Sequence, residues 1–217
     1  MIGISCSNLE RARRNRVLFA ELLSDGDKLS RGGTFGMFRH WQEIAKRTHM
    51  GDVGLGEALR QLESACEHFA VTTRNRDKQA YLMEEFVRYM KRHKSEKLVW
   101  NEPRHQFRWQ LIPQVRLTGI TPWVFKREDI YYAYFCLEQP AQWQEELKYP
   151  LLQRYLADHL LHCRLNQLQI GVYCLERRDF EWKRFLPLEV RTAVQEASQL
   201  FTDIFNEYSR LREDAGH

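Results

Sequence analysis

The sequence has no long apolar run and few cysteines, and these two shortages exclude several classes of protein. Its longest largely apolar runs, such as VLFAELL, are far shorter than the ~20 residues that cross a bilayer. The five cysteines are scattered without a Cys-x-x-Cys pair, which argues against a disulfide framework or a paired-cysteine zinc site. The N-terminal residues become charged at once and lack the apolar core of a secretory signal. We therefore expect a cytoplasmic protein with reduced thiols and no membrane partner.

Glycine-rich phosphate loops and nucleophile elbows are also missing. The segment GDVGLGEAL has three glycines, but it lacks the preceding strand and the lysine of a phosphate-binding loop. No segment has the strand-to-helix presentation that a Ser–His–Asp or Cys–His nucleophile needs. We predict no cofactor and no bound metal, and we favour a protein without enzymatic activity.

Apolar residues and an uneven charge distribution are what the sequence does have. Hydrophobic residues make up 43% of the chain and aromatic residues 12%, which is typical of a packed globular protein. Residues 1–97 contain 18 Lys and Arg against 13 Asp and Glu, whereas the remaining 120 residues contain 15 against 16. The basic excess in the first part permits an anionic partner without requiring one.

Helical spacing of apolar residues dominates the N-terminal part of the chain. Ser7 and Glu10 have the spacing of a capping box, in which each side chain bonds the backbone of the other residue. Thr34 is the expected cap of a second helix that ends at Gly51, and the turn TTRNRD separates a third helix from a fourth. We predict a helical region over residues 1–96.

The pattern changes near Lys97. Aromatic and β-branched residues fill the segments KLVW, FRWQLIPQVRLTG, PWVF and IYYAYFCLE, with turn residues between them. Helical spacing returns over residues 142–165, QIGVYCLE is a short apolar strand, and residues 188–211 form a long amphipathic helix. We predict an α+β fold in which residues 97–217 form a small, mostly antiparallel sheet flanked by helices, with a long C-terminal helix. Two domains, divided at residue 97, and one compact unit both remain open.

The order of the predicted elements after residue 75 is a helix, three or four antiparallel strands, a helix, a strand and a helix. Over residues 77–186, this order and spacing resemble the αβββαβ core of the PD-(D/E)XK nuclease superfamily. In active members of that superfamily, an Asp near the second strand and an acid-x-Lys motif on the third hold Mg²⁺. The ion activates water and stabilises the charge that develops on the phosphate.

The acids that the resemblance leads us to expect are missing. The segment RLTGITPW, at the second-strand position, contains no Asp, and residues 134–136 are Tyr-Phe-Cys where acid-x-Lys is expected. These side chains do not ligate a hard cation, so the resemblance implies a catalytically inactive copy. An alternative is a metal-dependent nuclease whose ligands have moved to Glu138, Glu145 and Lys148. The other interpretation of Glu145 and Lys148 is a solvated first helical turn.

Two basic clusters on predicted helices are candidates for contact with nucleic-acid phosphates. A solvated or protein-binding face is the other interpretation, because cations are also favoured in the last turn of a helix. If the clusters do bind nucleic acid, a second alternative function is a DNA-binding regulator. The candidate residues are Arg11, Arg13, Arg14, Arg16, Arg88, Lys91, Arg92 and Lys94.

Copies of an enzyme fold that lose their chemistry usually keep a scaffold role, so we predict a non-catalytic accessory subunit of a multi-protein, nucleic-acid-associated complex. The resemblance implies bacterial anti-phage or anti-plasmid defence as its setting. An SMC-like ATPase and a nuclease are the expected partners, with non-specific contact to DNA or RNA. Exposed aromatic residues favour interfaces, and burial in the core is the alternative. The candidates for a partner surface are Trp109, Trp123, Tyr131, Tyr132 and Trp143.

Overall fold

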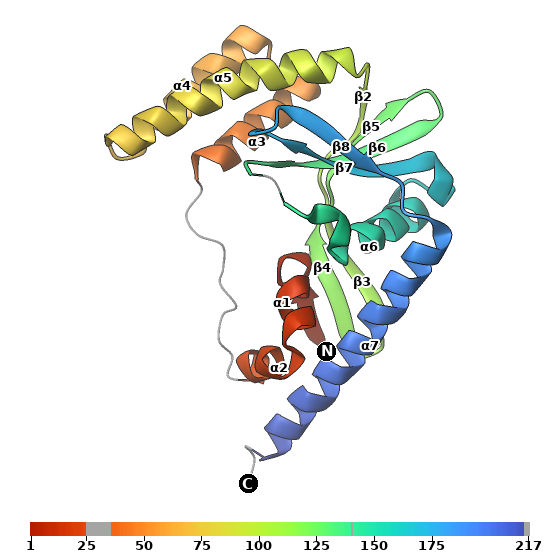
Figure 1. The fold of residues 1–217 in the computed structure, drawn as a ribbon. Coiled ribbons are helices and arrows are strands. Elements are labelled where there is room, and N and C mark those ends of the chain that lie inside the picture. The colour runs from red at the N-terminus through yellow and green to blue at the C-terminus, as the bar shows by residue number, and fades with distance from the viewer. Residues whose placement is uncertain (25–35, 140, 215–217) are drawn as a thin grey trace.

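The fold is mixed α+β, as the sequence predicts. A computed structural model describes residues 1–24, 36–139 and 141–214, and Thr34, the expected helix cap, lies outside these residues. Helices flank two β-sheets, and the long helix α7 (Pro187–Asp214) ends the described chain (Figure 1). Within the described residues, every helix is too short or too polar to traverse a lipid bilayer.

A five-stranded sheet in the order β2-β5-β6-β7-β8 forms the centre of the fold. The β6–β7 pair is parallel and the other three pairs are antiparallel. Because parallel neighbours need a crossover, helix α6 (Lys148–Tyr155) connects β6 to β7. The strands are β2 (Val99–Glu102), β5 (Trp123–Arg127), β6 (Ile130–Leu137), β7 (Leu168–Cys174) and β8 (Asp179–Lys183).

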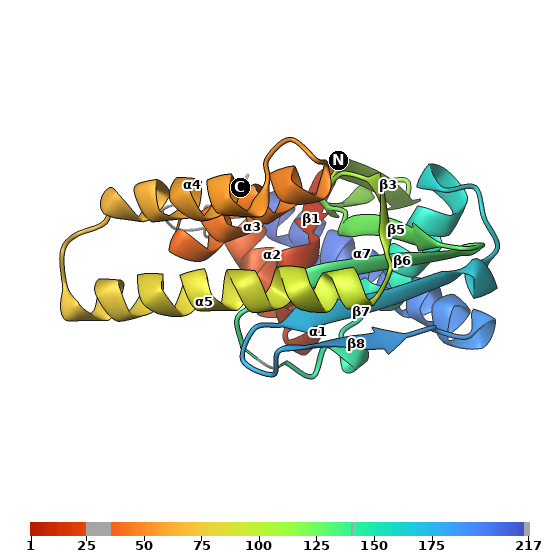
Figure 2. The ribbon, with the colours of Figure 1, turned by 90° about the horizontal axis from the view of Figure 1, so that it is seen from above.

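Three helices cover one face of this sheet, and α6 covers the other (Figure 1). The three helices are amphipathic, and their apolar faces, which include the fully buried Trp41, Leu62 and Phe86, form one core with aromatic residues of the sheet. Figure 2 shows α4 and α5 side by side as they extend past the edge of the sheet. These helices are α3 (Met37–His49), α4 (Leu55–Glu67) and α5 (Thr73–Ser95).

A second sheet, in the order β1-β4-β3, packs against the two N-terminal helices and α7. The predicted helical region therefore begins with a strand that sequence reasoning missed: β1 pairs with β4 in parallel, with Ile2 opposite Val115. The segment RLTGITPW is divided, because its first five residues belong to β4 and Trp123 begins β5. The remaining elements are β1 (Ile2–Ser5), α1 (Leu9–Arg14), α2 (Arg16–Ser24), β3 (Gln106–Ile112) and β4 (Val115–Ile120).

The predicted capping box of the first helix does not form. Ser7 lies in a 3₁₀ turn before α1, and its hydroxyl lies 2.9 Å from the hydroxyl of Ser5. Glu10 accepts a hydrogen bond from the backbone N–H of Leu147 at 2.6 Å, and so ties α1 to the segment before α6. A tertiary partner for this carboxylate has replaced the local one.

Candidate functional site

Buried side chains occupy the positions on β6 at which the resemblance leads us to expect acid-x-Lys, and the segment RLTGITPW is divided between β4 and the start of β5. Trp123, the first residue of β5, lies directly opposite Tyr134 of β6 in the antiparallel register. Both side chains are buried, and so is Cys136 further along β6. None of the three provides the carboxylate oxygens that Mg²⁺ prefers.

A buried hydrogen-bonded chain joins Tyr134 to the helices above it. The hydroxyls of Tyr134 and Tyr89 are 2.6 Å apart, and the Tyr89 hydroxyl lies 2.6 Å from Nε2 of His49. The ring of His93 lies 4.2 Å from that of His49, between centroids. Burial lowers the pKa of His49 well below its usual range, with a smaller effect of His93, and lowers the pKa of His93 to about 4. Both histidines are therefore neutral near pH 7, and the chain is an uncharged core network.

Arg104 brings one positive charge to the border of this core. Its guanidinium lies 4.6 Å from the ring centroid of Trp123 and donates to Oε1 of Gln42 at 3.2 Å. Gln42 in turn donates to the backbone carbonyl of Cys136 at 3.1 Å. Burial raises the pKa of the Cys136 thiol to about 12, so this cysteine is a neutral thiol, not a thiolate, at neutral pH.

The structure does not assemble the alternative set of acids into a metal site. Glu138 forms an ion pair with Lys78 of α5. Glu145 and Lys148 instead line a cavity of about 420 Å³ that does not include Glu138, and Lys148 pairs with Glu146 at 2.7 Å. Within the described ranges, no group of three or more His, Cys, Asp or Glu side chains is arranged to hold a metal ion.

Two arginines of the first basic cluster hold the N-terminal helices to α7. Arg13 donates from Nε to Glu196 at 2.6 Å, and Arg16 pairs with Asp203 at 2.7 Å. Arg11 and Arg14 form no ion pair with another described residue, although Arg14 lines the same cavity as Glu145. Half of this cluster therefore has a structural partner inside the chain.

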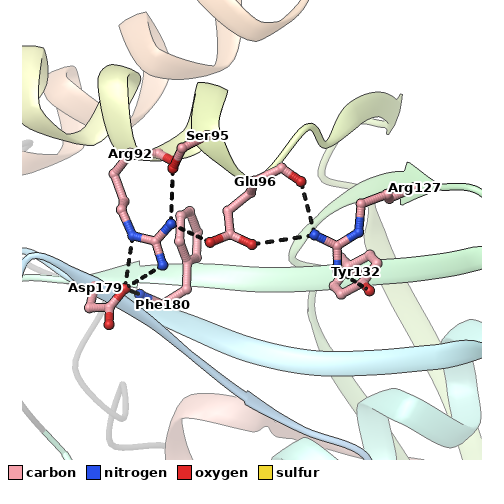
Figure 3. Close-up of polar contacts among 7 residues, drawn as sticks. All are labelled: Arg92, Ser95, Glu96, Arg127, Tyr132, Asp179 and Phe180. Carbon is pink, nitrogen blue, oxygen red and sulfur yellow. Dashed lines mark hydrogen bonds and ion pairs between the residues drawn. The ribbon is translucent and has the colours of Figure 1, made fainter.

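In the second basic cluster, one residue, Arg92, ties α5 to the sheet (Figure 3). Arg92 donates from Nε to Asp179 of β8 at 2.9 Å and also pairs with Glu96, which in turn pairs with Arg127 of β5 at 3.5 Å. Arg88 pairs with Glu84 and with the fully buried Glu85. The other two members, Lys91 and Lys94, are exposed, and neither forms an ion pair within the part of the chain that the structure describes.

Three of the five aromatic candidates for a partner surface belong to the core. Trp123 and Trp143 each expose 1% of their surface and Tyr132 exposes 6%, whereas Trp109 and Tyr131 are half-buried. Trp143 donates from Nε1 to Glu181 at 2.9 Å and packs against Tyr149. The five side chains therefore do not form one exposed surface, and burial, the alternative interpretation, describes most of them.

Sequence reasoning missed a cavity of about 600 Å³ at the N-terminal end of α5, which we call the α5 cavity. It lies where α3 begins and where β6 ends, and three half-buried aromatic rings line it: Phe38, Phe69 and Tyr81. Its charged lining comes from Arg74, Asp77, Lys78 and Glu138. Two arginines in TTRNRD, at the start of a predicted helix, were the only local sign of it.

The described residues thus contain a filled region, which is the packed core around Trp123 and Tyr134 at the centre of the sheet, and an open one, which is the α5 cavity at its margin. In the filled one, Trp123 and Tyr134 are buried and uncharged, and the guanidinium of Arg104 borders them. The open one combines cationic, anionic and aromatic side chains. Comparison of the chain with models of protein families and with curated proteins finds no match.

Proposed function

We propose that this chain is a non-catalytic accessory subunit of a multi-protein complex that acts on nucleic acid. One observation carries the proposal: Tyr134 and Cys136, at the strand position where a nuclease of the resembled superfamily needs acid-x-Lys, are buried, and the buried Trp123 lies opposite Tyr134. The network of Tyr134, Tyr89 and His49 locks that position into the core. Restoring a metal site there would require rebuilding the core, so the element order serves as a scaffold.

The setting we propose is bacterial anti-phage or anti-plasmid defence, in the company of an SMC-like ATPase and a separate nuclease. Non-specific contact with DNA or RNA belongs to the proposal. It is supported by Arg11, Arg14, Lys91 and Lys94, which have no ionic partner among the described residues.

Purification of the tagged full-length chain from its native host tests this proposal. We expect the chain to elute in a complex of fixed stoichiometry with other protein subunits, identified by mass spectrometry. A chain that elutes alone and cleaves DNA or RNA in the presence of Mg²⁺ or Mn²⁺ would overturn it. The metal-dependent nuclease with relocated ligands would then take its place.

A further inference from the structure

The α5 cavity has the size and the mixed lining of a site for a small ligand. Its volume of about 600 Å³ lies within the range of known ligand pockets, ~300–1,000 Å³. Its walls come from α3, the loop after α4, the first turns of α5 and the residue that follows β6. Four elements therefore define the shape of the cavity, and each of them is held in place by packing among the helices or by the sheet.

One wall of the cavity is aromatic. Phe38 stacks on the fully buried Trp41, with 5.7 Å between ring centroids and 29° between planes. Phe69 meets the ring of His40 edge-on at 6.0 Å, and Tyr81 lies on the same helix as Lys78. The rings are half-buried and anchored by neighbours, so they offer stacking surfaces at little cost in side-chain entropy.

The part of the lining that comes from the first turns of α5 carries cations. Arg74 lies in the first turn of α5, which has no acidic residue, although the helix dipole favours acids there and disfavours arginine. Within the described chain Arg74 has no ionic partner. Lys78, one turn further on, pairs with Glu138, and its Nζ lies 5.9 Å from the ring centroid of Tyr81. Arg74 is exposed and is therefore accessible to an anion in the cavity.

We propose that the α5 cavity binds an unpaired nucleotide, with its base against the aromatic wall and its phosphate on Arg74 and Lys78. Aromatic rings combined with Arg or Lys are the means by which proteins bind single-stranded nucleic acid, and guanidinium suits phosphate. Bases within a duplex are stacked on one another and do not reach such a wall. The proposal deepens the proposed function and rests on it, since it gives the subunit a way to contact the nucleic acid of its complex.

Two acids also line the cavity and define how the site works. Glu138 neutralises Lys78 in the structure, and a phosphate would compete with this carboxylate for the ammonium group. Asp77 remains beside Arg74 and limits the excess of positive charge. The site therefore depends on stacking as well as on charge, which distinguishes it from a general basic patch.

Fluorescence anisotropy with a labelled oligothymidylate, at low salt and with EDTA to exclude metal, measures the binding directly. We expect Arg74→Glu and Tyr81→Leu each to weaken binding about tenfold. Arg76→Glu is the matched control, because Arg76 lies on the same turn, is exposed and does not line the cavity. Its general electrostatic effect should be about threefold or less. Thermal unfolding of each variant checks that it is folded.

Glu138→Gln separates ligand binding from a structural role. If Glu138 competes with phosphate for Lys78, this variant binds the oligonucleotide about threefold more tightly. Competition with AMP distinguishes a free nucleotide from a strand as the source of the ligand: displacement at comparable concentrations indicates the former, and its absence the latter. Either result supports the site.

Three results would overturn the assignment: no binding by the unmodified protein, equal weakening by Arg74→Glu and Arg76→Glu, or no tightening by Glu138→Gln. If one of these results is obtained while the native complex still purifies intact, the nucleotide site in the α5 cavity is rejected and the proposed function is not. A chain that elutes alone and cleaves nucleic acid would instead remove the proposed function.

Discussion

Two regions beneath helix α5 differ in what they do with the same kinds of side chain. Under its C-terminal half, Tyr89 and His93 pack on Tyr134 in a core without accessible charge. At its N-terminal end, Lys78 and Glu138 form an ion pair on the edge of the α5 cavity. Strand β6 leads from one region to the other, since Glu138 directly follows the strand and stands four positions after Tyr134.

This difference shows that charge in the sequence does not locate a binding site unless its internal partners are known. Arg92 and Arg13 belong to the most basic segments, yet both pair with acids of the same chain. Arg74 belongs to a short turn and lacks such a partner among the described residues. Aromatic residues divide in the same way, with Trp123 and Tyr134 in the core and Phe38, Phe69 and Tyr81 on the cavity.

The largest expected effect comes from introducing an acid at Tyr134, in the filled region. Tyr134→Asp places a carboxylate in a fully buried position and leaves a cavity where the ring was, so we expect a loss of about 4 kcal/mol or more in unfolding free energy. Urea denaturation measures it. Tyr134→Phe is the matched control, since it removes only the hydroxyl bonded to Tyr89 and should lose about 1 kcal/mol.

If the Tyr134→Asp protein lost less than about 1 kcal/mol, the region would not be a packed core. A stable Tyr134→Asp protein that gained Mg²⁺-dependent stability would show directly that an acid is tolerated at this position.

The next largest effect is expected from acid, which should lower the free energy of unfolding through the filled region. Burial holds the pKa of His93 at about 4, against 6.5 for an exposed histidine. Between these pH values the unfolded chain therefore binds a proton at this histidine and the folded chain does not. The contribution is fully present above pH 6.5 and is lost as the pH falls towards about 4. The loss attributable to His93 is about 3 kcal/mol. Unfolding measured at several pH values shows the slope.

The control for this prediction is His93→Phe, which keeps a ring and removes the titrating group. The variant should lose less stability between pH 7 and pH 4 than the unmodified protein does. An identical pH profile for both proteins would place the acid sensitivity elsewhere.

A smaller effect is expected where α5 is tied to the sheet. Arg92→Ala removes the contacts with Asp179 and Glu96, and we expect a loss of about 1 kcal/mol because the guanidinium is partly exposed to solvent. Lys91→Ala, at the neighbouring exposed position, should change stability by less than about 0.5 kcal/mol. Equal losses in the two variants would remove the distinction between tied and untied cations.

The smallest effect is expected at the N-terminal helices. Arg16→Ala breaks the pair with Asp203 of α7, and a loss of about 0.5 kcal/mol follows because the arginine is largely exposed. Arg11→Ala serves as the control without an ionic partner among the described residues and should have no measurable effect on unfolding. High salt should reduce the difference between the two variants, and a difference that salt leaves unchanged would argue against the ion pair.

The fold class was predictable because its signals are local. Helical spacing through the first part of the chain and alternation in FRWQL are properties of short segments, and the structure confirms an α+β fold. The first strand was not predictable in this way. Ile2 and Ile4 become buried only through pairing with β4, more than a hundred residues later, and four residues carry too little periodicity to reveal it.

The candidate sites were predictable only in part. The lack of acids in YYAYFCLE could be seen directly, and the structure places those residues in a sheet whose neighbours are aromatic. The α5 cavity was beyond reach, because Phe38, Phe69 and Glu138 come from distant segments that only the tertiary fold brings together. Likewise, Glu196, which pairs with Arg13, and Asp179, which pairs with Arg92, lie at least 87 residues away along the chain.

Cleavage of single- and double-stranded DNA and of RNA by the isolated chain, with Mg²⁺ or Mn²⁺, is the most direct test of the central claim. We expect no cleavage by the unmodified protein and no change in Glu138→Ala or Glu145→Ala. Metal-dependent cleavage that is lost in these two variants, and retained in a Glu63→Ala control on the exposed face of α4, would contradict it.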